Sequence, residues 1–459
     1  MRKNNILNWI KLSSFIFALS SLFASCSNEL DEALQPENNG TLQFVVSDFP
    51  MFGEGTQTRV IGTQDEGKTA WENGDQIIVT LISQKYGEQA VALTYNGSSW
   101  STEASLSYLE NETPSVSVFY APCYEVTEEG TMQLRSGMQL GMTEYLSGNY
   151  EIENGIMTIT FEGAIRTYSR LRIATMSNAS LTVSTEGFTP AGATEVAAAA
   201  YTLTTDNNGN AFLYGVFAED AAVSVKQGDV VLKDYTFTAE KNPNGTAHNK
   251  SYALDATPVI DGTLGGKATA TEDDITALME QLKAYVDNGI TTIIVPGSKS
   301  AIITVGNITE TAIGEAIYRL SGNGNYDENN PYKGKIDLVL PDVTEIVAME
   351  FYAAFALNSI TLPKVTTIGD MAFQGCDHLT KLTFGSVLTT IDEHDGLMFW
   401  VGEKVDGCDL FLNCGQMNSQ YVPDLATNTW TILHTNEFKS ITLTHTGENS
   451  ECDECKALQ

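Results

Sequence analysis

Basic side chains are scarce in this chain of 459 residues, because 25 Lys and Arg stand against 58 Asp and Glu and give a formal net charge of −33. After the N-terminal segment, no stretch gathers basic residues as a phosphate-binding surface would. Nucleic acid is therefore excluded as a partner. The acidic excess indicates either solubility or a need for divalent cations, and we favour solubility.

Catalytic and metal-binding motifs are also lacking. The five His residues occur in no His-x-x-x-His, metalloprotease or triad context. The glycines at 322–325 follow a helix-like segment rather than a strand, which is the wrong order for a dinucleotide site. The acidic turn at 392–395 could gather a cation, but an exposed turn between repeats is the simpler interpretation. We expect no enzymatic activity, no cofactor and no metal site.

Cysteine is sparse for an exported protein, and its spacing indicates no dense disulfide framework. The pair Cys452 and Cys455 has redox or zinc spacing, but no second pair accompanies it in the polar tail. The other close pair is Cys408 and Cys414, and the disulfide pairing stays open. The seven cysteines are Cys26, Cys123, Cys376, Cys408, Cys414, Cys452 and Cys455.

No segment is long and apolar enough to span a bilayer, and the one marked apolar run is short and lies near the N-terminus. Basic residues precede this run at 12–23, and Ala24, Ser25 and Cys26 follow it, which is typical of a secretory signal peptide. Its end resembles the lipobox of bacterial lipoproteins. That resemblance implies removal of residues 1–25 and a diacylated Cys26 as the mature N-terminus.

An acidic tether at 26–40 follows Cys26. Its first residues resemble the signal by which some Gram-negative lipoproteins reach the outer leaflet and face the exterior. A solvated tether explains the same residues equally well.

Residues 41–258 contain short runs of alternating apolar and polar residues separated by Asn, Gly and Asp turns, as in antiparallel sheets. We predict two β-sandwich domains, at 41–165 and 166–258. Hairpin turns are expected at Asn96-Gly97, at Asn154-Gly155 and at 206–209. The predicted strands are 42–46, 76–82, 90–95, 115–120, 156–161, 170–174 and 211–216.

A new domain is predicted at 271–459, after a glycine-rich linker at 259–270. Apolar residues at helical spacing predict a helix over 273–288. Thr271 and Asp274 can cap its start, and Asn288-Gly289 ends it.

An internal repeat follows this helix. Residues 340–346 match residues 362–368, and the same spacing relates Phe351 to Phe373 and Ile360 to Leu382. A third copy continues the pattern with one inserted residue. Such repeats predict a short solenoid whose units bury their apolar sides by stacking. The helix and the strand 293–295 would cover its N-terminal end, and the segment from Cys408 the other end.

The segment 362–379, with its Leu-Pro, Ile-Gly, Ala-Phe and Cys positions, resembles the leucine-rich repeat of bacterial surface antigens, the BspA-like type. The first half, with the lipobox, the strand at 42–46 and the block 71–77, resembles fimbrillin-like pilus proteins. That second resemblance implies two transthyretin-like sandwiches and donor-strand assembly after cleavage at an arginine. Arg59 occupies the matching position, although an ordinary loop charge explains it as well.

These features together predict a lipid-anchored outer-membrane protein, exposed on the cell surface, that acts in adhesion or pilus-associated recognition. Its partners would be the membrane, a protein or glycan ligand, and pilus subunits. The alternative is a glycan-binding lipoprotein in which exposed aromatic residues such as Trp400 and Trp430 stack on sugars.

Overall fold

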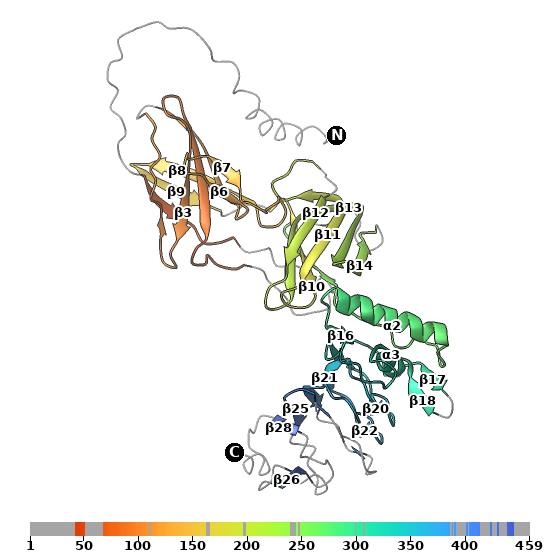
Figure 1. The fold of residues 1–459 in the computed structure, drawn as a ribbon. Coiled ribbons are helices and arrows are strands. Elements are labelled where there is room, and N and C mark those ends of the chain that lie inside the picture. Colours follow the sequence, from red (N-terminus) through yellow and green to blue (C-terminus); the bar gives the residue numbers. More distant parts are fainter. Residues whose placement is uncertain are drawn as a thin grey trace, which may run out of the picture.

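The computed structural model describes residues 42–50, 68–109, 112–161, 166–195, 199–238, 245–246, 248–298, 300–305, 308–385, 388, 390–391, 401–402, 404–413, 423–424, 429–430 and 438–444. Within these residues the protein is mainly β, with two helices. The buried apolar side chains form three clusters that follow one another along the chain, from Leu42, from Leu171 and from Ile260 (Figure 1).

The first cluster packs against a seven-stranded sheet in the order β1-β9-β8-β5-β2-β3-β4. All pairs in it are antiparallel except β1, which lies parallel to β9 at one edge. The predicted turns at Asn96-Gly97 and Asn154-Gly155 join the paired strands β3 to β4 and β8 to β9. The strands are β1 (Gln43–Val46), β2 (Gln76–Ser83), β3 (Gly87–Tyr95), β4 (Trp100–Ser101), β5 (Ser115–Tyr120), β8 (Leu146–Glu153) and β9 (Ile156–Thr160), beside the hairpin of β6 (Tyr124–Val126) and β7 (Met132–Leu134).

The second cluster packs against a six-stranded sheet in the order β12-β11-β13-β10-β15, with β14 on β13. The predicted strands at 170–174 and 211–216 correspond to β10 and to the first part of β13. The strands are β10 (Ser169–Ala174), β11 (Ser180–Pro190), β12 (Ala199–Thr204), β13 (Asn210–Gln227), β14 (Val230–Thr236) and β15 (Ser251–Asp255).

The hairpin predicted at 206–209 is wrong in its pairing. The turn exists, since the amide of Gly209 donates to the carbonyl of Asp206 at 3.0 Å. The strands that it joins do not pair, because β12 lies on β11 whereas β13 lies on β10, β11 and β14. β13 has 18 residues, of which 210–215 pair with β10, 222–227 pair with β14, and residues between 215 and 226 pair with β11. Turn residues locate a reversal of the chain, but they do not determine which strand each arm joins.

The predicted helix is α2 (Glu272–Asp287), and its start has the predicted capping box between Thr271 and Asp274. Asn288 ends it, followed by Gly289 at a φ of +74°. A second helix, α3 (Ala312–Leu320), follows the hairpin of β17 (Ile302–Val305) and β18 (Ile308–Thr311). The sequence indicated α3 only as a helix-like segment.

The third part is built on a parallel sheet in the order β16-β19-β21-β23-β25-β28. A second parallel set, β20-β22-β24, runs beside it. The strands are β16 (Thr292–Ile294), β19 (Ile336–Val339), β20 (Glu345–Ile346), β21 (Leu357–Leu362), β22 (Thr367–Ile368), β23 (Lys381–Phe384), β24 (Thr390–Ile391), β25 (Cys408–Asn413) and β28 (Phe438–Thr444), with the short pair β26 (Pro423–Asp424) and β27 (Thr429–Trp430).

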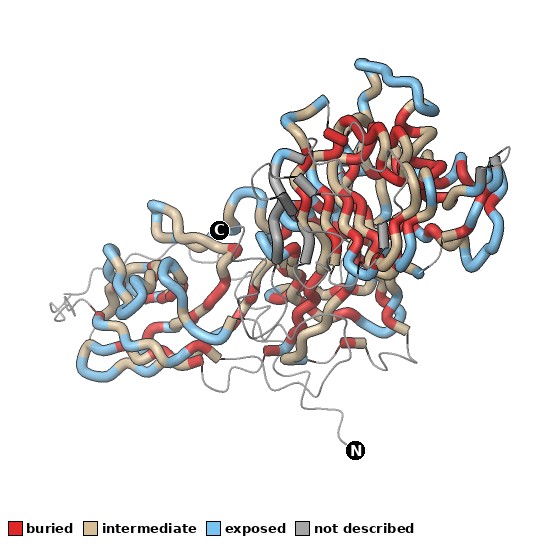
Figure 2. Tube along the Cα trace, turned by 90° about the horizontal axis from the view of Figure 1, so that it is seen from below, coloured by how far each residue is buried: buried red, intermediate tan, exposed pale blue. Residues whose placement is uncertain are grey.

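The register of the strands confirms the repeat spacing. Ile360 pairs with Leu382, and the rings of Phe351 and Phe373 stack with centroids 5.7 Å apart. Ile368 pairs with Ile391, at a spacing one residue longer than that between Ile360 and Leu382. This difference corresponds to the inserted residue of the third copy. Figure 2 shows the buried positions of successive repeats lying in rows through this part of the molecule. Each unit therefore buries its apolar side against its neighbours.

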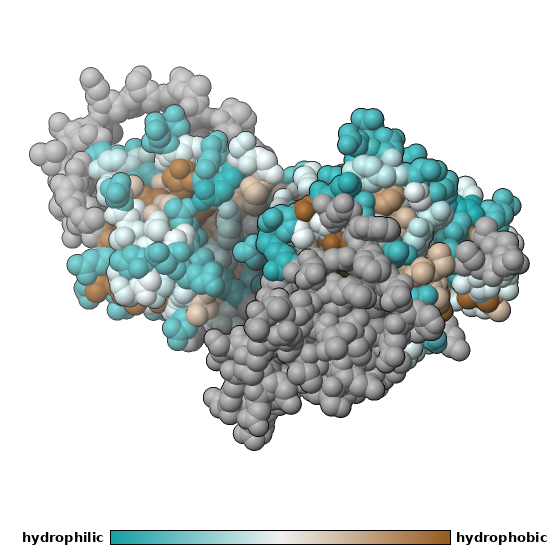
Figure 3. Space-filling model, turned by 60° about the horizontal axis from the view of Figure 1, so that its bottom comes forward, coloured by the Kyte–Doolittle hydropathy of each residue, from teal (hydrophilic) through white to brown (hydrophobic). Residues whose placement is uncertain are grey.

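The segment predicted as a linker, 259–270, contributes Ile260 and Ala270 to the third cluster. The predicted division of the chain into six segments, from the signal peptide at 1–25 to the repeat domain at 271–459, stays a prediction. Within the described residues, no helix is long and apolar enough to cross a membrane. On the face in Figure 3, apolar residues are scattered among hydrophilic ones.

Candidate functional site

The outward face of the parallel sheet is the main candidate surface for binding. Alternate residues of a strand point to opposite faces. The inward row consists of fully buried apolar residues, namely Leu338, Ile360, Leu382 and Leu410. The residues between them form two rows on the other face, one polar and one mixed. One row is Asp337, Ser359, Lys381 and Asp409, and the other is Val339, Thr361, Thr383 and Phe411.

Side chains on this face are linked across the strands. Asp337 accepts from the Ser359 hydroxyl at 2.6 Å and from the Asn358 amide at 2.7 Å. The Lys381 ammonium lies 4.6 Å from the centre of the Phe411 ring. The face thus offers donors, acceptors and one aromatic ring at fixed spacing, which suits recognition of a polar ligand.

Three carboxylates gather where β18 and α3 meet the first repeat. Glu350 is 2% exposed and accepts from the Thr311 hydroxyl at 2.8 Å and from the Val347 amide at 3.0 Å. Burial raises the pKa of Glu350 to about 7. Burial, and then the Glu315 carboxylate, raise the pKa of Glu310 to about 7 as well. Thr311 also caps α3 by accepting from the Gly314 amide.

These carboxylates lie at the contact between the two helices and the first repeat. Within the part of the chain that the structure describes, no group of three His, Cys, Asp or Glu side chains is arranged to hold a metal ion. Glu315 is bound by Arg319 at 2.6 Å, and the same guanidinium reaches Glu272 of α2 at 2.7 Å. The cluster therefore ties the two helices to the repeats.

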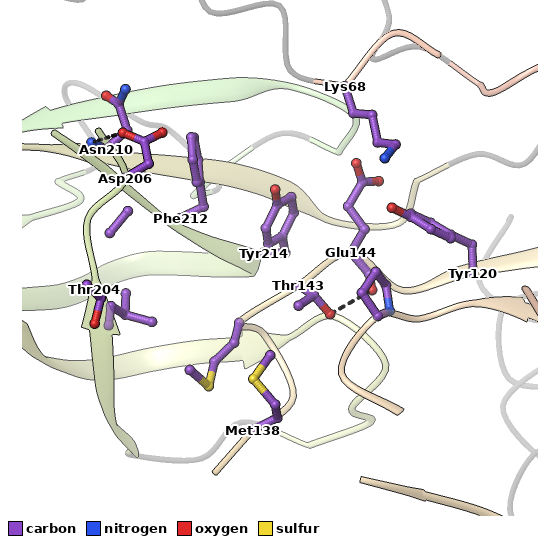
Figure 4. Close-up of a pocket in the computed structure, with 14 residues that line it drawn as sticks. Lys68, Tyr120, Met138, Thr143, Glu144, Thr204, Asp206, Asn210, Phe212 and Tyr214 are labelled. Atoms are coloured by element: carbon purple, nitrogen blue, oxygen red, sulfur yellow. Dashed lines mark hydrogen bonds between the residues drawn. The ribbon is translucent and has the colours of Figure 1, made fainter. Parts of the chain in front are cut away.

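A cavity of about 420 Å³ lies between the first and second sheets (Figure 4). Lys68 and Tyr120 point toward Glu144 on one side of it, and Phe212 and Tyr214 lie on the other. Glu144 is held by the Arg166 guanidinium at 2.8 Å, and the Lys68 ammonium lies 2.7 Å from Asp75.

The charged groups around this cavity are engaged within the protein. The Tyr168 hydroxyl also donates to Glu144, at 2.9 Å. Burial, and then the charges of Asp75 and Glu144, raise the pKa of the Tyr120 hydroxyl well above its ordinary value. The charged groups that line the cavity therefore also connect the two sheets to the segments beside them.

The structure describes only some of the site residues that the sequence predicts. Cys26 and Arg59 lie outside the described residues, as do Trp400 and the acidic turn 392–395. Trp430 belongs to β27. The pairing of Cys414, Cys452 and Cys455 also lies outside the described residues.

Cys376 is fully buried, as its repeat position predicts, and its thiol donates to the carbonyl of Phe351 at 3.0 Å. Cys123 and Cys408 are buried free thiols. Burial raises the pKa of Cys408 to about 12. These three thiols are structural, because a buried neutral thiol is a poor nucleophile and a poor metal ligand.

One group of residues was not singled out from the sequence. Tyr326, in the loop after α3, packs against Phe355 and His378 of the repeats. The three residues are far apart in the chain, and the only signal was an aromatic residue in an acidic loop. The stacking of the repeats brings them together.

Three comparisons relate the chain to known proteins. Residues 337–395 match the model of a family described as BspA type leucine rich repeat region (6 copies). Among curated proteins, no sequence matches this chain. Among solved structures, a candidate cell adhesion protein from Bacteroides fragilis NCTC 9343 is similar over 47% of this chain and 92% of its own, with 12% identity and a TM-score of 0.28.

That structural likeness is too weak to carry an argument, and the fimbrillin resemblance of the first half stays a prediction. The match at 337–395 coincides with strands β19 to β24, whose register follows the repeat. This part of the chain is therefore similar to the BspA-type leucine-rich repeats.

Proposed function

We propose that the protein is a lipid-anchored adhesin of the cell surface that binds a partner through the outward face of its parallel sheet. The observation that carries this proposal is the stack of BspA-type repeats at 337–395, with an in-register polar row beside a buried apolar row. An extended surface of this kind suits recognition of a partner. In this proposal the repeats form a short solenoid, with α2 and β16 at its N-terminal end.

The proposed anchor is the diacylated Cys26, followed by the acidic tether 26–40. Two or three acyl chains hold a protein firmly at a bilayer surface, since each buried methylene contributes about 0.8 kcal/mol. The proposed location is the outer membrane, with the repeats facing the exterior. The signal sequence and the lipobox-like residues before Cys26 support this part of the proposal.

The first two sheets are proposed to be transthyretin-like sandwiches that hold the repeats away from the membrane. Their position in the chain supports this, because both sheets lie between the tether and the repeats. The role is binding rather than catalysis. The lack of a catalytic motif in the sequence and the engaged charges around the cavity support that view.

Association with a pilus is a second candidate role, and the position of β1 favours it. β1 lies at a sheet edge, parallel to β9, and it precedes Arg59. Cleavage after Arg59 would leave β1 held only by its sheet contacts, so a strand from another subunit could replace it. A fraction of the cell-derived protein that starts at Val60 would support this role.

Attachment of cells tests the adhesive role. Cells that produce the chain should bind to a matrix-coated surface more strongly than cells that lack it. Cells that produce Lys381→Glu together with Thr361→Glu should lose that gain, because the two changes place like charges on the two outward rows. Equal attachment of producing and non-producing cells, with the protein present on the surface, would refute adhesion.

A further inference from the structure

The residues around Tyr326 form a second, smaller surface at the edge of the repeats. The Tyr326 ring is 38% exposed. It meets the Phe355 ring edge to face, with centroids 5.4 Å apart, and it stacks on the His378 ring at 5.8 Å. An exposed aromatic ring fixed by two other rings is a rigid platform, so little conformational entropy is lost when a ligand contacts it.

Two ammonium groups lie over this same ring. The Lys333 Nζ is 5.1 Å from the ring centre and the Lys404 Nζ is 5.6 Å from it. The Lys333 ammonium donates to the backbone carbonyl of Glu328, and neither ammonium forms an ion pair with a carboxylate of the described residues. The two ammonium groups thus place positive charge beside one exposed ring, which favours an anionic ligand.

The imidazole of His378 lies near the two lysines, Lys333 and Lys404. Burial, and then the charges of Lys333 and Lys404, lower the pKa of its imidazole. Its Nδ1 atom is buried and has no hydrogen-bond partner in the structure. Gly334 permits this packing, because a Cβ there would lie 3.3 Å from the His378 Cβ. The two lysines therefore supply the positive charge beside this imidazole.

We propose that Tyr326, Lys333 and Lys404 bind the anionic group of an acidic saccharide, a sugar that carries a carboxylate or a sulfate. The ammonium groups would pair with the anion, and the sugar ring would lie against the exposed part of the Tyr326 side chain. An acidic sugar carries both the anion and the ring within one small unit. The inference rests on the proposed adhesive role and names the class of ligand that would serve it.

The test measures binding of the full chain, purified in detergent, to immobilised polysaccharides. The probes are polygalacturonate for the carboxylate, heparin for the sulfate and dextran as the neutral reference. Retention on either anionic polymer, weakened by salt and absent on dextran, is the expected result. The polymer that binds identifies the anion.

Variants connect the binding to the surface. Lys333→Gln with Lys404→Gln should weaken binding by about tenfold or more, whereas Lys333→Arg should retain it. Lys335→Gln is the control for the change at Lys333. Lys335 is exposed and lies two residues from Lys333, and its substitution removes one positive charge. Circular dichroism and thermal unfolding would show that each variant is folded.

Three outcomes would overturn the inference. In the first, neither anionic polysaccharide binds better than dextran. In the second, the Lys335→Gln control loses as much affinity as the double variant. In the third, polyglutamate, included as a fourth probe, is the one polymer that binds, which would indicate an acidic protein ligand. If cells that produce the chain still attach to a matrix while no polysaccharide binds, the inference fails and the adhesive role stands.

Discussion

The buried carboxyl group of Glu350 should make the junction between α3 and the first repeat sensitive to pH. Its pKa is about 7 in the folded protein, against an ordinary value of 4.5, because burial penalises the charged form. The Thr311 hydroxyl and the Val347 amide lower this pKa, and the nearby Glu345 charge raises it. Folding therefore favours the protonated form.

The sign and size of the effect follow from this shift. A group with a raised pKa contributes its full stability below the unfolded value, and that stability is lost as pH rises through the folded value. The contribution of Glu350 is thus present below pH 4.5 and lost through about pH 7. Between pH 5.5 and pH 7.5 we expect the local free energy of opening to fall by about 2 kcal/mol, which is about 30-fold in the opening equilibrium.

Hydrogen exchange measured by mass spectrometry checks this, on peptides that cover 312–320 and 345–352, after correction for the intrinsic rate at each pH. Glu350→Gln should lose most of the pH dependence, whatever its effect on overall stability. Glu280→Gln is the control and should retain it, because this exposed carboxylate of α2 does not act on the pKa of Glu350. The pKa of Glu310 is also raised, but its side chain is only half-buried. A smaller dependence of the opening free energy on pH should therefore remain in Glu350→Gln. If wild type and Glu350→Gln show the same pH dependence, the reasoning is refuted.

Three further substitutions test the packing. Phe373→Ala should destabilise the repeats by about 3–5 kcal/mol, because its fully buried ring stacks on the preceding repeat, and urea unfolding would measure the loss. Gly369→Ala should also destabilise the repeats, since a Cβ there would overlap backbone atoms of Ala348, and a thermal midpoint equal to that of wild type would contradict this. Glu144→Gln should cost about 3 kcal/mol because it removes the negative charge that the buried Arg166 guanidinium binds at 2.8 Å, and a stability unchanged in urea would exclude that role.

Periodic features of the sequence predicted much of the fold. The alternation at 76–82 and the spacing between Ile360 and Leu382 both reflect burial on one side of a strand, so the pattern carries the structure directly. The cap at Thr271 was equally legible, because a capping box needs only two residues at a fixed spacing. Helix α3 was harder to predict, since it is short and follows a hairpin without a break in composition.

Pairing across long distances in the chain could not be predicted in the same way. The prediction of a turn at 206–209 was confirmed, but β13 pairs with β10 and β11 rather than with the strand before the turn. The surface at Tyr326 has the same origin, because His378 and Lys404 reach it only once the repeats are stacked. A sequence pattern records local burial, whereas such a site depends on which repeats become neighbours.

The most direct test of the proposed function is the mass of the N-terminal peptide of protein released from intact cells by mild surface proteolysis and detergent. The account predicts that the repeats are cleaved from whole cells, and that the remaining anchored fragment begins at a diacylated Cys26. A chain that stays protected from the protease, or an N-terminal peptide without acyl chains on Cys26, would contradict the account of a lipid-anchored adhesin on the cell surface.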